Sequence, residues 1–198
     1  MKATTYQDAI DIYDAILESN ASALGKLEAK AAPDVTNLHA KNKITEQKIS
    51  LYELMKISSE WDNVAKELTT GMRISFNLGY KTLLDVYGKT NDINIAIVHT
   101  FLTILAKYPD TLIARKVGAK HVKEISKAVE IGLIEAKKIS RKAKNVLKLG
   151  GLTSEAGKRA LIQFDGNLRE PKNRLNPGTT ADITASSLMI AILCDMRP

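Results

Sequence analysis

The sequence predicts an all-α protein that folds as one helical domain of about seven or eight helices. Only 5% of its residues are aromatic, and Leu, Ile and Ala dominate the apolar residues, a balance that favours helices. Apolar residues recur at helical spacing along most of the chain, without a convincing apolar–polar alternation typical of strands. A chain of 198 residues is long enough to bury roughly two thirds to three quarters of its unfolded surface. We therefore expect residues 1–198 to form a single domain.

Two capping boxes mark helix starts in the first third of the chain. The box at Thr5 predicts a helix over residues 5–19, and the box at Ser50 predicts an amphipathic helix that continues to residue 71. Between them, residues 20–49 carry glycine, proline and asparagine without a sustained period. This composition predicts a long loop.

Glycine, proline and capping residues divide the rest of the chain into shorter elements. We expect a brief extended piece at 71–76, a helical turn at 81–86 and an apolar helix from Asn91 or Asp92 to Lys107. A short helix should follow from Asp110 or Thr111 to Gly118, and then one long or two abutting helices over 120–149. The last two elements are a helix from Thr153 or Ser154 to about Leu168 and a final helix ending at Leu193. The final helix is almost wholly apolar beyond its start, which suits an interior position.

The net charge of +7 predicts attraction to polyanions, including nucleotide phosphates. Much of the excess lies in residues 137–148, where basic and apolar residues interleave at helical spacing. This pattern is typical of the solvated face of an amphipathic helix. Since the stretch has neither stacking aromatics nor a recognisable nucleic-acid module, nucleic-acid binding is not expected.

The cysteine content and the hydropathy pattern indicate a cytoplasmic protein. Cys194 is the only cysteine, which excludes an internal disulfide and a cysteine-based metal cluster. No apolar run reaches the ~18 residues that a membrane span needs, and the N-terminus lacks the apolar core of a signal peptide.

Polar residues gather at residues 174–183, where the apolar final helix begins. The candidate N-caps are Asn176, Thr179 and Thr180, and Pro177 suits the first helical position. A helix start rich in free N–H groups can hold a phosphate, and Asp182 can face a metal ion or a ribose hydroxyl one turn into the helix. The alternative is a well-capped core helix without a ligand.

A second polar set surrounds the start of the short helix before Gly118. Arg115 and Lys116 follow Thr111 by four and five residues, near enough to share one end of a short helix. An arginine fork and a compact lysine charge suit a triphosphate or pyrophosphate. Asp110 can join this set or serve only as an N-cap.

Lys26 follows Gly25 in the predicted loop and can meet a phosphate as a point charge. It does not belong to a P-loop, because Asn20 and Leu27 occupy positions that would need glycine and Ser or Thr. A surface lysine after a turn is the equal alternative.

Two further candidates are weak on the residues alone. A lone imidazole such as His99, inside an apolar helix, is more often a hydrogen-bonded core group than a ligand. Glu60 and Asp62 flank Trp61 and would point away from each other on a helix, so they do not form a carboxylate dyad. No pair of histidines has the spacing of a zinc site.

Four segments, in order along the chain, resemble one enzyme family. They are residues 51–62, residues 95–116 with the run Ile-Val-His-Thr-Phe-Leu, residues 150–169 with Phe-Asp at 164–165, and residues 176–188, Asn-Pro-Gly-Thr-Thr-Ala-Asp-Ile-Thr-Ala-Ser-Ser-Leu. They are similar to segments of the triphosphoribosyl-dephospho-CoA synthase family, particularly of its archaeal-type members. The family proteins are longer, and this chain resembles their C-terminal half without the motifs of their N-terminal half.

The resemblance implies an enzyme that joins a ribosyl unit from ATP to dephospho-CoA, releases adenine and leaves the triphosphate on the ribose. It also implies a magnesium ion on the triphosphate. The catalytic residues expected on this basis are His99, Asp110 and Asp182, with Asp110 and Asp182 as ligands of the magnesium ion or the ribose. The expected nucleotide- and phosphate-binding residues are Lys26, Thr111, Arg115, Lys116, Arg174, Asn176, Thr179 and Thr180, and Asp165 is a secondary candidate.

The half-length resemblance leaves a second function open. In that alternative the chain is a non-catalytic nucleotide-binding subunit or a remnant of the enzyme, and its active site is completed by a separate N-terminal-half partner. An apolar surface left by the missing half would favour such a partner chain or a homo-oligomer.

Overall fold

The all-α prediction is confirmed by a computed structural model, which describes residues 1–19, 27–29, 33, 39–169 and 175–197. These residues contain ten α-helices and no strand, so the helix count exceeds the predicted seven or eight. The helices are α1 (Tyr6–Glu18), α2 (Ala40–Glu46), α3 (Leu51–Ser58), α4 (Asn63–Thr70), α5 (Lys81–Thr90), α6 (Ile93–Lys107), α7 (Thr111–Gly118), α8 (Ile125–Lys148), α9 (Glu155–Arg169) and α10 (Gly178–Leu193). A π-helix, η2 (Ser75–Tyr80), precedes α5, and a 3-10 turn, η3 (Gly151–Thr153), precedes α9.

The predicted helix over residues 50–71 is two helices, because Asp62 starts a new one. One oxygen of the Asp62 carboxylate accepts hydrogen bonds from the N–H groups of Val64 and Ala65, at 2.8 and 2.9 Å. Asp62 itself is in the extended conformation that an N-cap adopts. The apolar stripe continues through this break, so the periodicity concealed it.

Two predictions for irregular segments are wrong. Residues 40–46 lie in the predicted loop but form α2, whose fully buried Ile44 packs with Ala9 and Tyr13 of α1. The expected extended piece at 71–76 is a turn that leads into η2. The buried carboxylate of Glu67 accepts hydrogen bonds from the N–H groups of Ile74 and Ser75, which directs the chain into that π-helix.

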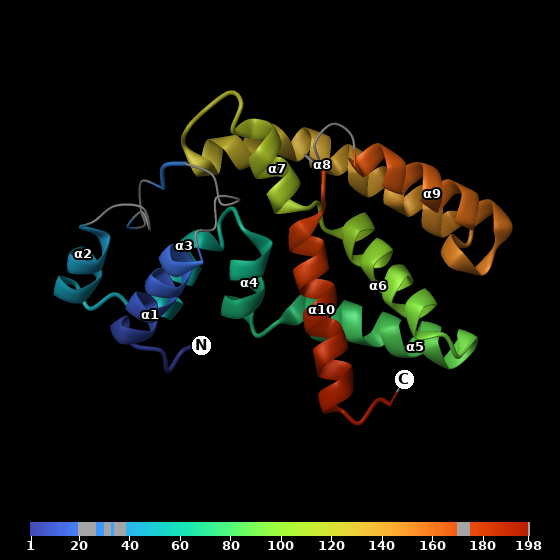
Figure 1. Cartoon of the computed structure of the whole chain (residues 1–198), viewed down its shortest axis with the longest axis horizontal. Helices are drawn as coiled ribbons and strands as arrows, with labels where there is room; N and C mark the ends of the chain where they lie inside the picture. The colour runs from blue at the N-terminus through green and yellow to red at the C-terminus, as the bar shows by residue number, and fades with distance from the viewer. Residues whose placement is uncertain (20–26, 30–32, 34–38, 170–174, 198) are drawn as a thin grey trace.

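The final helix, α10, passes through the middle of the molecule (Figure 1). It packs against α4, η2, α5, α6 and α7. The largest core cluster lies beside it, among α6, α7, α8 and α9, and includes Leu102, Ile113, Ile139 and Phe164. One side of α10 is buried, but Met189, Ile192 and Leu193 are 56%, 41% and 71% exposed, so the expected interior position holds for only part of this helix. The polar start of α10 lies against the starts of α4 and α7. None of the helices in the described ranges combines the length and apolarity that crossing a membrane requires.

Helices α7 and α8 touch at their backbones through two glycines. A Cβ atom on Gly132 of α8 would lie 1.9 Å from the carbonyl oxygen of Ala114, and a Cβ on Gly118 of α7 would lie 1.7 Å from that of Ala128. Neither carbonyl can move without its helix. This close crossing fixes α7 on α8 and thereby fixes the start of α7.

We predict that Gly132→Ala lowers the free energy of unfolding by about 2–3 kcal/mol or more, because the added methyl group overlaps backbone. Urea unfolding followed by circular dichroism measures the change. The matched control is Gly166→Ala in α9, where a Cβ meets nothing within 4 Å and should stabilise the helix by about 0.5–1 kcal/mol. Equal effects at the two glycines would contradict the close crossing.

Candidate active site where three helices begin

The first turns of α4, α7 and α10 meet, and small polar side chains join them. The Thr111 hydroxyl accepts a hydrogen bond from the N–H of Asn63 at 3.2 Å and lies 3.2 Å from the hydroxyl of Thr179. The Thr179 hydroxyl in turn accepts from the N–H of Leu112 at 3.2 Å. The Asn63 side chain donates to the carbonyl of Pro109 at 3.1 Å. Two predicted site residues from distant segments are therefore in direct contact.

The carboxylate of Asp110 lies at the centre of this junction and is fully buried. Its Oδ1 accepts a hydrogen bond from the N–H of Ile113 at 3.0 Å, which caps α7. Its Oδ2 accepts from both the N–H and the hydroxyl of Thr180, at 2.7 and 2.8 Å, which caps α10. Burial raises the pKa of Asp110 above its ordinary range, and the hydrogen bonds from these donors offset part of that rise.

Asp110 thus joins two helix starts, which is more than the N-cap expected from its position in the sequence. Both of its oxygens are engaged inside the protein, and neither reaches solvent. This environment suits a positioning residue and does not suit the predicted role as a magnesium ligand.

The expectation that the start of α10 is rich in free N–H groups is wrong. The Thr180 N–H bonds to Asp110, the Gly178 N–H bonds to the Asn176 carbonyl at 3.0 Å, and the Ala181 N–H bonds to the Pro177 carbonyl at 3.1 Å. Pro177 precedes the helix, and Gly178 is its first residue. The side-chain cap of α10 comes from α7, so none of its local candidate N-caps fills that role.

The exposed Asp182 has a carboxylate neighbour, Asp62, at the start of α4. The pKa of Asp182 is raised first by desolvation and then by the negative charge of Asp62. Among the residues that the structure describes, the hydrogen bonds of Asp62 are made by its Oδ1, and they cap α4. Asp62 and Asp182 come from segments far apart in the chain, so the sequence alone carries no signal for their proximity.

The Asp62–Asp182 pair has the donor chemistry of a partial magnesium site. Two carboxylates near each other repel, and a divalent cation relieves that repulsion. No cluster of three or more His, Cys, Asp or Glu side chains that could hold a metal ion occurs in the described part of the chain. Magnesium is commonly held by one or two protein carboxylates together with substrate phosphates, so two carboxylates fit it.

Arg115 is the basic group best placed beside this junction. It follows Thr111 by four residues and therefore lies on the same face of α7. Arg115 and Lys116 are half-buried, and neither makes an ion pair with any residue that the structure describes. Lys26 and Arg174, the other predicted phosphate ligands, lie outside the described residues.

His99 lies away from the junction, on the earlier part of α6. The helix places it about 12 Å from Lys107, where α6 ends. Its Nε2 atom accepts a hydrogen bond from the N–H of Leu152 in η3 at 3.1 Å. Burial lowers the pKa of this half-buried imidazole. The structure therefore does not bring His99 together with Asp110 and Asp182.

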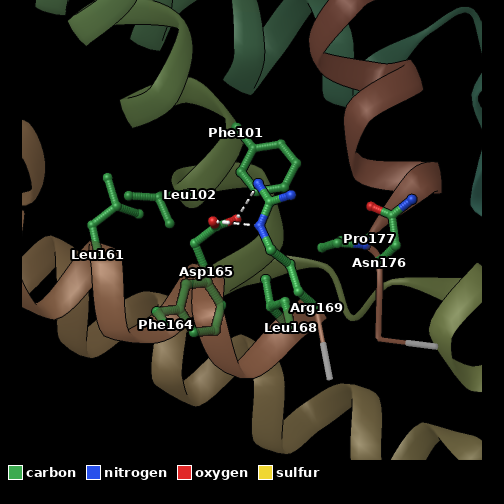
Figure 2. Close-up of a pocket in the computed structure, with 9 residues that line it drawn as sticks. All are labelled: Phe101, Leu102, Leu161, Phe164, Asp165, Leu168, Arg169, Asn176 and Pro177. Atoms are coloured by element: carbon green, nitrogen blue, oxygen red, sulfur yellow. Dashed lines mark hydrogen bonds and ion pairs between the residues drawn. The ribbon is translucent and has the colours of Figure 1, made fainter. Parts of the chain in front are cut away.

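A pocket of about 280 Å³ lies between α6, α9 and the two residues that precede α10 (Figure 2). Its lining includes Asn176, a predicted nucleotide-binding residue, and Asp165, the secondary candidate. The Asp165 carboxylate pairs with Arg169 through two contacts, at 2.7 and 3.1 Å. The sequence alone carries no signal for this pocket, because its walls come from three separate segments.

Residues 1–197 match the sequence model of the CitG family, described as ATP:dephospho-CoA triphosphoribosyl transferase. The chain belongs to this family. The resemblance seen in the four sequence segments is therefore confirmed.

One solved structure supports the same relationship. It is the crystal structure of a proposed triphosphoribosyl-dephospho-CoA synthase from Archaeoglobus fulgidus, with 29% sequence identity and a TM-score of 0.66. The match covers 97% of this chain and 68% of that protein, so this chain is the shorter of the two. No curated protein matches this chain.

We predict that Asp110→Asn destabilises the fold by about 1–3 kcal/mol, because the new amide group cannot accept every hydrogen bond that the carboxylate accepts. Urea unfolding measures the loss. Asp85→Asn is the control, since Asp85 is exposed on α5, where its carboxylate pairs with the exposed Lys89, so the loss of stability should stay within about 0.5 kcal/mol. If Asp110→Asn were as stable as this control, Asp110 would not hold the junction.

His99 should make stability depend on pH in the weakly acidic range. Because its folded-state pKa lies below the ordinary value of about 6.5, its contribution is complete above that value and is lost as the pH falls through the folded pKa. Protonation removes the acceptor that Leu152 uses. The urea concentration at the midpoint of unfolding should therefore change less between pH 7.5 and pH 5.5 in His99→Gln than in the wild type. An unchanged difference would assign the pH dependence to other groups.

Proposed function

We propose that this chain transfers the triphosphoribosyl unit of ATP to dephospho-CoA, with release of adenine, and that the junction of α4, α7 and α10 holds the triphosphate. The match of residues 1–197 to the CitG family carries the choice of reaction. The choice of place rests on the Asp62–Asp182 pair, which stands beside the three helix starts.

The reaction is a substitution at the anomeric carbon of the ribose. The bond from that carbon to the adenine nitrogen breaks, and a bond to the acceptor hydroxyl oxygen forms. The hydroxyl gives up its proton, and the departing adenine takes one. Positive charge grows on the sugar as the base leaves, so the protein must hold the phosphates, orient the hydroxyl and assist proton transfer.

Asp62 and Asp182 are the residues that would hold the magnesium ion of the nucleotide substrate. When bound, that ion neutralises part of the triphosphate charge. Asp110 takes no direct part in this scheme. It positions Asp182 by fixing the start of α10 against α7.

Cationic side chains supply the remaining charge for the triphosphate. Arg115 and Lys116 are half-buried on α7 and carry no competing ion pair among the described residues. An arginine in a partly buried position can bind phosphate oxygens through two parallel hydrogen bonds. We assign Lys26 and Arg174 to the same task on the family resemblance alone.

We predict that Asp182→Asn lowers adenine release from ATP, with dephospho-CoA present, by roughly 10²-fold, the scale of losing one electrostatic contact in an active site. Chromatographic detection of free adenine measures the rate. Magnesium with ATP should raise the melting temperature of the wild type and not that of the variant. Asp85→Asn, on exposed α5, should retain both responses.

The stability of the free variant gives a second, independent readout. The pKa of Asp182 is raised in the folded state, so its ionisation opposes folding as the pH rises through that pKa. At pH 7 and without nucleotide, Asp182→Asn should therefore be at least as stable as the wild type. A variant that is less stable but keeps full activity would identify Asp182 as a favourable first-turn helix charge and remove it from the site.

A further inference from the structure

We infer that the pocket between α6 and α9 is a subsite for an adenine ring. This inference rests on the proposed function, because both substrates of that reaction, ATP and dephospho-CoA, carry adenine.

The size and walls of the pocket suit a flat heterocycle. Its volume of about 280 Å³ lies at the lower end of small-molecule pockets, which hold roughly 300–1,000 Å³, so it suits one base better than a whole nucleotide. Two phenylalanines, Phe101 of α6 and Phe164 of α9, contribute rings to the lining (Figure 2). Aromatic side chains are the usual stacking partners of bases. The buried positions of Leu102, Phe164 and Leu168 make the walls rigid.

The polar groups of the lining match the edge of adenine. Asn176 offers an amide, which can pair with the amino group and the neighbouring ring nitrogen of adenine. Asp165 offers a carboxylate, which can accept from the same amino group. Its bond to Arg169 holds that carboxylate in place, and Figure 2 shows the two side chains turned toward each other.

The same ion pair argues against a phosphate or a purely aliphatic group in the pocket. The charge of Arg169 is balanced by Asp165, and the carboxylate would repel a phosphate. An aliphatic chain would make no hydrogen bond with Asp165 or Asn176, so it would gain less from this lining than a ring with polar edges. A neutral ring with hydrogen-bonding edges meets both conditions.

The pocket adjoins the proposed phosphate site through the start of α10. Asn176 and Pro177 line the pocket and directly precede α10, and Asp182 lies within the first five residues of that helix. The pocket and the proposed magnesium ligand are therefore connected by one short segment of the chain.

Binding of free adenine to the full chain, measured by calorimetry, tests the subsite without turnover. Leu161→Trp places a large ring in the pocket lining and should weaken adenine binding at least 10-fold. Its matched control is Ile162→Trp, the adjacent position on α9, which is 73% exposed and does not line the pocket.

A second variant, Asn176→Ala, removes one hydrogen-bonding group from an exposed position and should weaken the binding of adenine several-fold. Its control, Asn167→Ala on the exposed face of α9, should leave adenine binding unchanged.

Parallel titrations with ATP and with dephospho-CoA identify which adenine occupies the pocket. A loss in Leu161→Trp for ATP alone assigns the donor base, and a loss for dephospho-CoA alone assigns the acceptor base. The inference is overturned if the wild type does not bind adenine at millimolar concentration, or if neither pocket variant weakens it relative to its control. A wild type that binds adenine in the pocket but never releases adenine from ATP would instead overturn the proposed transferase function and leave the subsite standing.

Discussion

The buried carboxylate of Asp110 is the constraint on which the candidate active site depends. A charge removed from water costs several kcal/mol unless donors replace the lost hydration. Asp110 finds three donors, and they belong to the first turns of two helices, α7 and α10. The positive ends of those helix dipoles stabilise the same charge. The two helix starts therefore remain together, and the pairing of Thr111 with Thr179 follows from their approach.

This arrangement decides how the protein can recognise a phosphate. Helix starts commonly bind anions through free N–H groups, but here Asp110 and Asp62 already take up N–H groups of α4, α7 and α10. Under the proposed function, recognition of the triphosphate would rest on side chains around the junction, which are cationic on α7 and carboxylate on α4 and α10. A magnesium ion would then link Asp182 to a polyanion of the same charge sign.

Features set by residues close together in the sequence, such as helix caps, could be predicted, whereas contacts between residues far apart in the sequence could not. The capping boxes at Thr5 and Ser50 were correct because a cap residue and its N–H partner lie within three positions. The helix break at Asp62 was missed because an unbroken apolar stripe runs across it. The pairing of Asp62 with Asp182 and the walls of the pocket join segments far apart in the chain, and single-sequence periodicity carries no signal for such contacts. The family resemblance located Asp182 and Asn176 without indicating what either would face.

A second close contact, between η2 and α10, also fixes the orientation of α10, the helix that carries Asp182. A Cβ on Gly79 of η2 would lie 1.9 Å from the Ser187 hydroxyl, so η2 and α10 pack too closely for the helix to turn. Held there and at Asp110, α10 keeps the backbone of Asp182 near the start of α4. Under the proposed function, a cation bound between Asp62 and Asp182 would relieve their repulsion. That relief would add to the affinity for the magnesium nucleotide, and binding would stabilise the folded chain.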